Sequence, residues 1–167
     1  MNLKIIYSLL FLYFLSNTET FATENIDLDV RTFEEFQPLL SPSDDKIYVF
    51  NFWATWCRPC IKELPYFEEL NKNYKNKNVK VYLISLDFID HLESHLLPFL
   101  NRNPLESELI LLNAPRYNQW IHKVSDEWSG AIPATIFLYD KGNSQKFYQQ
   151  EFTYSELENI IKSIQTN

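Results

Sequence analysis

Hydrophobic positions in this chain follow two patterns that alternate along its length. Short, mostly apolar runs rich in β-branched and aromatic residues are typical of buried strands, and they lie at 47–53, 79–86, 108–112 and 134–139. Apolar residues three or four positions apart predict helices that bury one face, and these lie at 32–40, from Pro59 or Cys60 to about Tyr74, and at 91–101, 117–123 and 154–164. A further strand at 146–151 follows a turn at 140–143. We therefore expect one α/β domain with a mixed sheet between helices.

The N-terminus has the pattern of a secretory leader. Lys4 supplies a positive charge, residues 5–15 form an apolar run, and Thr20 and Ala22 are small residues suited to the positions before a cleavage site. The run is shorter than the roughly 20 apolar residues that span a membrane, and it lacks the amphipathic spacing of a buried N-terminal helix. We expect residues 1–22 to be a signal peptide and residues 23–167 to be an exported domain in a bacterial periplasm or cell envelope, with no membrane span after cleavage.

Charge and glycine content exclude two classes of binding site. The net charge is −7, from 15 basic and 22 acidic side chains, whereas proteins that bind nucleic acids carry a basic face. The chain has two glycines, Gly130 and Gly142, far apart, and loops that cradle phosphates need several glycines close together. We therefore expect no nucleic-acid partner, no P-loop and no dinucleotide-binding loop.

The chain contains two cysteines, Cys57 and Cys60. A disulfide between them closes too short a loop to constrain the unfolded chain much, so it is a poor structural staple. A zinc site needs further ligands at a defined distance, and the histidines, His91, His95 and His122, do not provide that spacing. The pair is therefore predicted to be a redox-active disulfide, with no metal and no other cofactor.

The position of the pair suggests a different role for each sulfur. The strand at 47–53 ends shortly before Cys57 and a helix begins between the cysteines, so free N–H groups and the helix dipole favour a thiolate at Cys57, the expected nucleophile. Cys60 lies one turn into the helix, where it is more buried and can resolve a mixed disulfide. Arg58 and Pro59 are expected to tune the relative stability of the two redox states of the pair. Arg58 would stabilise a Cys57 thiolate by its charge if its side chain turns inward, and Pro59 suits the first turn of the helix.

Two features further along the chain are candidates to complete the site. Pro133, before the strand at 134–139, either has a cis peptide bond that leaves the Ile132 backbone free to pair with an extended substrate, or is an ordinary trans proline at a strand start. Glu63 lies three residues beyond Cys60, on the same helical face. It is either a carboxylate that accepts a proton from the buried sulfur or a solvated acid on the helix surface.

Two stretches of the sequence resemble a known family. VFNFWATWCRPCIKELP at 49–65 and GAIPATIF at 130–137 resemble the TlpA/ResA-like branch of the thioredoxin superfamily. The resemblance covers the chain from about Asn25 to its end, and it implies a thioredoxin-like fold, a cis Pro133 and a functional glutamate at Glu63. Trp56, Ile132 and Pro133 are the residues expected to contact the substrate. Ordinary thioredoxins have a buried aspartate where this chain has Asn51, which cannot transfer a proton.

The resemblance also implies a function. Relatives reduce disulfides in other proteins, so we expect an exported thiol-disulfide oxidoreductase whose clients are envelope proteins with disulfides and whose electrons come from a membrane or envelope donor. The same chemistry in reverse, as a disulfide oxidase or isomerase, is an alternative because residues 58 and 59 tune its direction. A second alternative is a thioredoxin-fold binding module in which the cysteines only stabilise the fold.

The stretch 113–131 differs from the simplest pattern of the family. It is longer, contains Trp120 and Trp128, and is expected near the rim of the active site. Either it forms a client-binding surface, or the two tryptophans pack a small core of its own.

Overall fold

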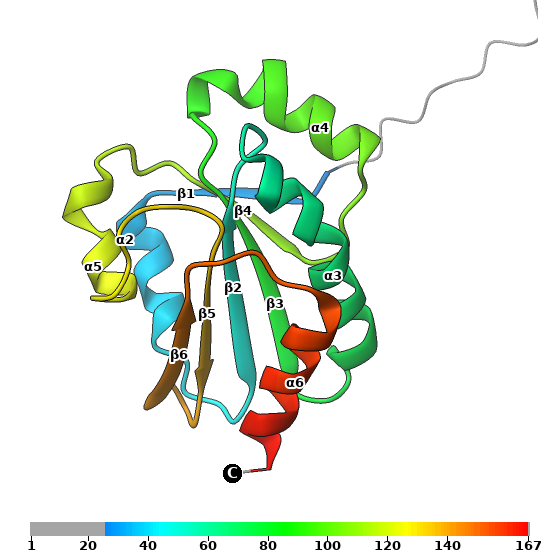
Figure 1. The fold of residues 1–167 in the computed structure, drawn as a ribbon. Coiled ribbons are helices and arrows are strands. Elements are labelled where there is room, and N and C mark those ends of the chain that lie inside the picture. Colours follow the sequence, from blue (N-terminus) through cyan, green and yellow to red (C-terminus); the bar gives the residue numbers. More distant parts are fainter. Residues whose placement is uncertain (1–25, 167) are drawn as a thin grey trace, which may run out of the picture.

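The computed structural model describes residues 26–166, which form a central sheet with helices on both faces (Figure 1). The predicted signal peptide, 1–22, lies outside the described residues. The strands are β1 (Leu28–Arg31), β2 (Ile47–Trp53), β3 (Val79–Ser85), β4 (Glu108–Leu112), β5 (Ala134–Tyr139) and β6 (Ser144–Tyr148). The helices are α2 (Phe33–Phe36), α3 (Arg58–Tyr74), α4 (Leu97–Arg102), α5 (Ile121–Val124) and α6 (Tyr154–Gln165). Within 26–166, no helix is both long enough and apolar enough to cross a membrane.

The strand order places β2 in the interior of the sheet. The order is β1-β4-β3-β2-β5-β6, with β1, β4, β3 and β2 parallel to one another and β5 antiparallel to both β2 and β6. Parallel strands bring their C-terminal ends to one edge of the sheet, the upper edge in Figure 1. The loops that follow β2, β3 and β4 therefore meet there, where open α/β sheets usually hold their functional sites.

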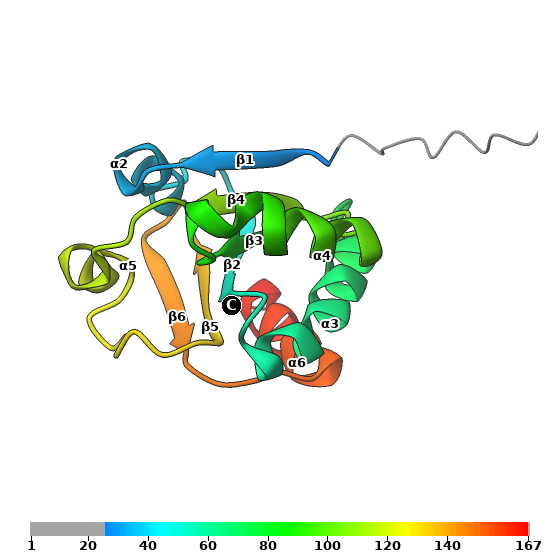
Figure 2. The same cartoon turned by 90° about the horizontal axis from the view of Figure 1, so that it is seen from above.

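Each face of the sheet is buried against its own helices, and Figure 2 shows α3 and α6 on one side and α5 on the other. Because side chains alternate along a strand, Val49 and Trp53 of β2 pack with residues of α3, α4 and α6, whereas Phe50 and Phe52 pack with residues of α2 and α5. Burial on both faces explains why the sequence of β2 is a continuous apolar run without polar alternation.

The strands agree closely with the sequence prediction in the interior of the sheet and less well at its edges. β2, β4 and β5 have the predicted bounds, and β3 ends at Ser85, one residue earlier than predicted. The strand predicted at 146–151 is wrong by two residues at its start and three at its end, because β5 provides pairing partners only from Ser144 to Tyr148. β1, a short edge strand in which Val30 is exposed, was not predicted from the sequence.

The segment predicted as a single helix at 91–101 is built from three pieces. A 3-10 turn at Ile89–His91 leads into a π-helix at Leu92–Leu96 and then into α4. Pro98 lies in the first turn of α4 and has no N–H to donate to the carbonyl group four residues earlier, so the regular α-helical ladder is interrupted. The predicted helix at 117–123 is also divided, into a 3-10 turn at Tyr117–Gln119 and α5.

Candidate active site

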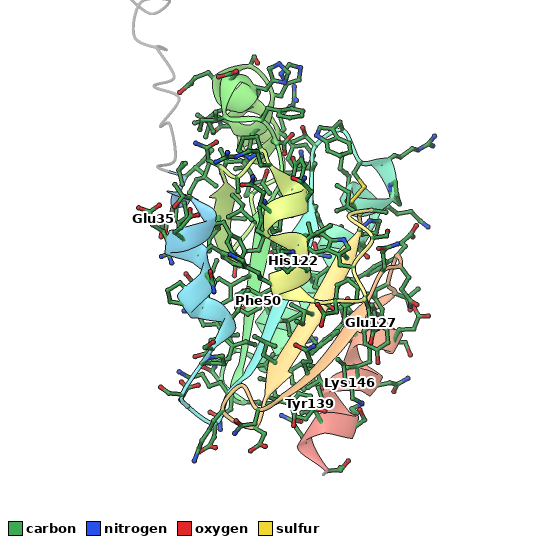
Figure 3. The ribbon with its side chains drawn as sticks, turned by 90° about the vertical axis from the view of Figure 1, so that its left-hand side faces the viewer. Glu35, Phe50, His122, Glu127, Tyr139 and Lys146 are labelled. Atoms are coloured by element: carbon green, nitrogen blue, oxygen red, sulfur yellow. A yellow bond between two sulfur atoms is a disulfide. The ribbon has the colours of Figure 1, made fainter. Side chains whose placement is uncertain are left out.

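Cys57 and Cys60 form a disulfide at the junction of β2 and α3, drawn as a yellow bond in Figure 3. Cys57 is the N-cap residue of α3, and its sulfur accepts a hydrogen bond from the backbone N–H of Cys60 at 3.3 Å. The free N–H groups and the positive end of the helix dipole at this position stabilise negative charge. The geometry therefore favours a thiolate at Cys57 once the disulfide is reduced.

The two cysteines differ in their access to solvent. Cys57 is 6% exposed and Cys60 is completely buried. Trp56, Arg58 and Pro59 are exposed around them. The first residue of the pair is therefore accessible from solvent, and the second is not. Arg58 does not turn inward, so its charge acts on Cys57 through solvent and is screened.

Ile132 and Pro133 lie beside the disulfide. The peptide bond between them is cis, and the carbonyl oxygen of Ile132 is 3.8 Å from the sulfur of Cys57. Pro133 is buried and leads into β5, whose first residue, Ala134, pairs with Phe52 of β2. The pairing of β2 with β5 thus brings together Cys57 and Ile132, which are 75 residues apart in the chain.

Glu63 is a fully buried carboxyl on α3, so the prediction of a solvated surface acid is wrong. Its Oε1 accepts a hydrogen bond from Asn51 Nδ2 at 2.7 Å, and its Oε2 accepts one from the backbone N–H of Phe152 at 2.8 Å. Burial raises the pKa of Glu63 to about 7, although the hydrogen bonds from Phe152 and Asn51 oppose this shift. Glu63 can therefore change its protonation state near neutral pH, one helical turn from Cys60.

Asn51 connects Glu63 to the strand that follows the cis proline. Its Nδ2 donates a second hydrogen bond, to Thr135 Oγ1 of β5, at 3.1 Å. An amide does not titrate in this pH range, so Asn51 holds the carboxyl group without exchanging a proton with it. The position that is a buried acid in ordinary thioredoxins is here a fixed hydrogen-bond donor.

Exposed apolar side chains gather near the disulfide. Among the described residues four large hydrophobic side chains are exposed, and three of them, Trp56, Phe88 and Ile89, follow the C-terminal ends of β2 and β3. Phe88 and Ile89 also line a hollow of about 120 Å³ with Leu112 and Tyr117. Exposed apolar side chains concentrated in one place are typical of surfaces that contact other proteins.

Comparison with known proteins agrees with this geometry. The model of a family described as the AhpC/TSA family matches residues 20–146. The chain belongs to the AhpC/TSA family. The predicted relationship to the TlpA/ResA-like branch of the thioredoxin superfamily is confirmed by the relatives described next.

Two curated proteins that are similar to this chain are both named thiol-disulfide oxidoreductase ResA. The protein from Oceanobacillus iheyensis is 29% identical over 126 residues, which cover 75% of this chain and 60% of the relative. The protein from Bacillus thuringiensis is 34% identical over 117 residues, which cover 68% of this chain and 61% of the relative. This chain therefore spans about three fifths of the length of either relative.

Solved structures confirm the predicted thioredoxin-like fold of this AhpC/TSA family member. A thioredoxin-related protein from Neisseria meningitidis serogroup B has a TM-score of 0.61 and is 25% identical, with coverage of 74% of this chain and 88% of that protein. The mixed sheet between helices that the sequence pattern predicted is the arrangement that this chain adopts.

Asp87 is a buried acid beside the active-site loop that the sequence analysis missed. Its carboxylate accepts hydrogen bonds from Thr55 N at 3.0 Å, from Ser85 Oγ at 2.8 Å and from the hydroxyl group of Thr55. Thr55 precedes Trp56, so Asp87 holds the loop between β2 and α3 against the end of β3. The available signal was an acid placed directly after a buried apolar strand.

Replacing Asp87 by alanine should destabilise the oxidised protein. The substitution leaves the N–H and hydroxyl groups of Thr55 and the hydroxyl group of Ser85 without their acceptor, which should lower the free energy of unfolding by about 2–4 kcal/mol. Urea unfolding measures this change. Asp90→Ala is the control, because Asp90 is an exposed acid near the same loop and should cost less than about 0.5 kcal/mol. Equal losses in the two variants would contradict the assignment.

Trp120 and Trp128 are both buried in the main core, so the prediction that they pack a small core within 113–131 is wrong. The other alternative, that the 113–131 stretch forms a client-binding surface, stays a prediction. Trp120 stacks on Phe33 with ring centroids 5.3 Å apart, and Trp128 lies 4.6 Å from Phe52 of β2. The two tryptophans therefore belong to the main core on one face of the sheet, not to a separate small core.

The three histidines of the chain are all exposed. His91 and His95 are exposed on the 3-10 turn and π-helix, with ring centroids 4.9 Å apart, and His122 is exposed on α5. Among residues 26–166, no group of three or more histidine, cysteine, aspartate or glutamate side chains has the geometry to hold a metal ion.

Proposed function

We propose that this chain is an exported thiol-disulfide oxidoreductase that reduces disulfides in client proteins of the cell envelope. The observation that carries the proposal is the oxidised pair itself, with an accessible Cys57 at the N-terminus of α3, a buried Cys60 behind it, and the Ile132 backbone 3.8 Å from the accessible sulfur. The names of the ResA relatives and the resemblance to the TlpA/ResA-like branch support the same activity.

The proposed reaction transfers two electrons from the reduced pair to a client disulfide. The thiolate of Cys57 attacks one client sulfur and forms a mixed disulfide, and the other client sulfur leaves as a thiolate and takes up a proton. Cys60 then loses its proton and attacks the Cys57 sulfur. The bond between Cys57 and the client breaks, the client sulfur that Cys57 had attacked leaves as a thiolate, and the Cys57–Cys60 disulfide forms.

Glu63 is the proposed acceptor of the Cys60 proton. Cys60 is completely buried, so water has poor access to its thiol. Glu63 lies on the same face of α3 and is equally buried, and a carboxyl with a pKa of about 7 is about half deprotonated at neutral pH and so able to accept a proton. Its hydrogen bonds from Asn51 and Phe152 hold it in place for this transfer.

A protein client fits the surroundings of Cys57 better than a small-molecule disulfide does. The backbone of Ile132, before the cis Pro133, can pair with an extended peptide segment on one side of the disulfide. Trp56, Phe88 and Ile89 present apolar surface near it. The oxidised pair formed in each cycle requires a further two-electron donor, which we propose to be a protein in the membrane or envelope.

An oxidant or isomerase is the second candidate, and one observation favours it. The N-terminus of α3 stabilises the thiolate of Cys57, and stabilising the reduced form makes a disulfide more oxidising. Arg58 is exposed, so it adds little to this effect. The balance between the two directions is set by the reduction potential of the pair.

We expect the Cys57–Cys60 pair to have a reduction potential below about −230 mV, towards the range of thioredoxin. The measurement equilibrates residues 23–167 against dithiothreitol or glutathione buffers and quantifies the oxidised fraction by mass spectrometry after thiol alkylation. A potential above about −180 mV, in the range of disulfide isomerases and stronger oxidants, would overturn the reductant proposal and favour an oxidase or isomerase.

A further inference from the structure

The loop between Trp128 and Pro133 is tied to the fold at two places. The indole N–H of Trp128 donates a hydrogen bond to the carbonyl oxygen of Ala131 at 2.8 Å. At the other end of the loop, Gln149 Oε1 accepts hydrogen bonds from the backbone N–H of Ser129 at 3.1 Å and from its hydroxyl group at 2.7 Å. Both ties hold main chain that leads directly to Ile132 and to the cis peptide bond before Pro133.

The Trp128 side chain is itself fixed within the core. It is 4% exposed. Its ring lies 4.6 Å from that of Phe52, 5.6 Å from that of Trp120 and 6.1 Å from that of Phe147, measured between centroids. Phe52 belongs to β2, which leads to Cys57, and Phe147 belongs to β6. The indole N–H of Trp128 is thus a hydrogen-bond donor held in a fixed position relative to β2, the strand that also positions the disulfide.

We infer that Trp128 and Gln149 are positioning residues that hold the Ile132 backbone ready for a client segment, an inference that rests on the proposed function. Gly130, with φ +91°, and Ala131 are exposed, so few side-chain contacts hold this loop. A loop that is already ordered loses little conformational entropy when a client pairs with it, and binding is correspondingly tighter. Trp128 is therefore part of client recognition without touching the client.

Trp120 provides a matched control for Trp128. It lies in the same stretch of chain, is 3% exposed, and donates its indole N–H to a backbone carbonyl, that of Ala114, at the same distance of 2.8 Å. Its bond holds the start of the 113–131 stretch, far in sequence from Ile132. Trp120→Phe and Trp128→Phe therefore each remove one indole hydrogen bond to a backbone carbonyl from the same aromatic cluster. Only Trp128→Phe removes a bond that holds the loop between Trp128 and Pro133.

The test compares a protein client with a disulfide that has no peptide groups. Reduced protein, freed of reductant, is mixed with insulin or with hydroxyethyl disulfide, and single-turnover rates are measured against concentration. For Trp128→Phe we expect the half-saturating insulin concentration to rise roughly three- to tenfold, the effect of one lost hydrogen bond. Its maximal rate and its rate with hydroxyethyl disulfide should stay unchanged, and Trp120→Phe should change none of these values.

Gln149→Ala tests the second tie without disturbing the core. Gln149 is exposed, so its removal should leave the stability of the protein unchanged while raising the half-saturating insulin concentration two- to fivefold. Unchanged half-saturation in both Trp128→Phe and Gln149→Ala, or an equal change in Trp120→Phe, would overturn the inference. A wild-type protein that reduces hydroxyethyl disulfide but not insulin would instead overturn the proposed function, and this inference with it.

Discussion

Cys60→Ser should stop the reaction at the mixed disulfide. With Cys57 still able to attack and no second sulfur to resolve the product, the variant should accumulate a covalent adduct with a client such as insulin. Turnover should fall by at least about 1,000-fold, since the step that releases the client has lost its nucleophile. Mass spectrometry or a non-reducing gel detects the adduct, and an added reductant should release it.

Cys57→Ser is the matched variant, and it should give neither turnover nor adduct. Cys60 is completely buried in the oxidised protein, whereas Cys57 reaches the surface. An adduct formed by Cys57→Ser would reverse the assignment of nucleophile and resolving cysteine. Client binding that survives unchanged when both cysteines are replaced, in a protein without turnover, would support a non-catalytic binding module.

Glu63→Gln should slow the release of the client by roughly 100- to 1,000-fold at neutral pH, the usual contribution of a general base. With a pKa of about 7, Glu63 accepts a proton only in its carboxylate form, so wild-type turnover should rise with pH through about 7. The variant should lose this rise while its first attack on the client is retained. The measurement is the pH profile of turnover, with separate detection of the mixed disulfide.

The choice of glutamine preserves the shape of the buried site. Asn51 Oδ1 has no hydrogen-bond partner among the described residues. If the Asn51 amide rotates by half a turn, its oxygen can accept a hydrogen bond from the side-chain N–H of the new glutamine. The N–H of Phe152 can still donate to the side-chain oxygen of that glutamine. Glu69→Gln, an exposed acid on the same helix, is the control and should behave as wild type. A pH profile of Glu63→Gln identical to that of the wild type would exclude Glu63 as the proton acceptor.

The same variant should also change how stability depends on pH. The pKa of Glu63 is about 7 in the folded protein against 4.5 for an ordinary glutamate, so between these values the folded protein binds more protons than the unfolded chain. The free energy of unfolding should therefore fall as pH rises through this window, by up to about 3 kcal/mol. Urea unfolding of the oxidised protein at several pH values measures this loss, and Glu63→Gln should remove it.

The parts of the fold that the sequence predicts well are those set by local pattern. β2 is recognisable from its own residues because both of its faces are buried, and so its bounds, Ile47–Trp53, follow directly from an unbroken apolar run. β1 gives no such signal, because a four-residue edge strand with an exposed Val30 buries little apolar surface. The π-helix at Leu92–Leu96 is equally hidden, since helical spacing does not distinguish it from a regular helix.

In the candidate site, too, features set by a short stretch of sequence can be predicted, and features that depend on distant residues cannot. The cysteine pair and its place at the start of α3 can be read from a short stretch of sequence. The burial of Glu63 cannot, because its second hydrogen bond comes from the backbone of Phe152, 89 residues away. Asp87 reaches Thr55 across 32 residues, and its role depends on β2 and β3 ending side by side, which only the strand order shows.

The strand order also means that the two edges of the sheet are not equivalent for the disulfide. Local opening of a protein starts at segments with few buried contacts, such as edge strands. β1 is separated from β2 by β4 and β3, so opening there should leave the pairing of β2 with both of its neighbours intact. β6 is separated from β2 by β5 alone, and the chain that leaves it carries Gln149 and Phe152, which bind Ser129 and Glu63. Local opening at the β1 edge should therefore affect the active site little. Local opening at the β6 edge should disturb both the loop between Trp128 and Pro133 and the buried carboxyl of Glu63.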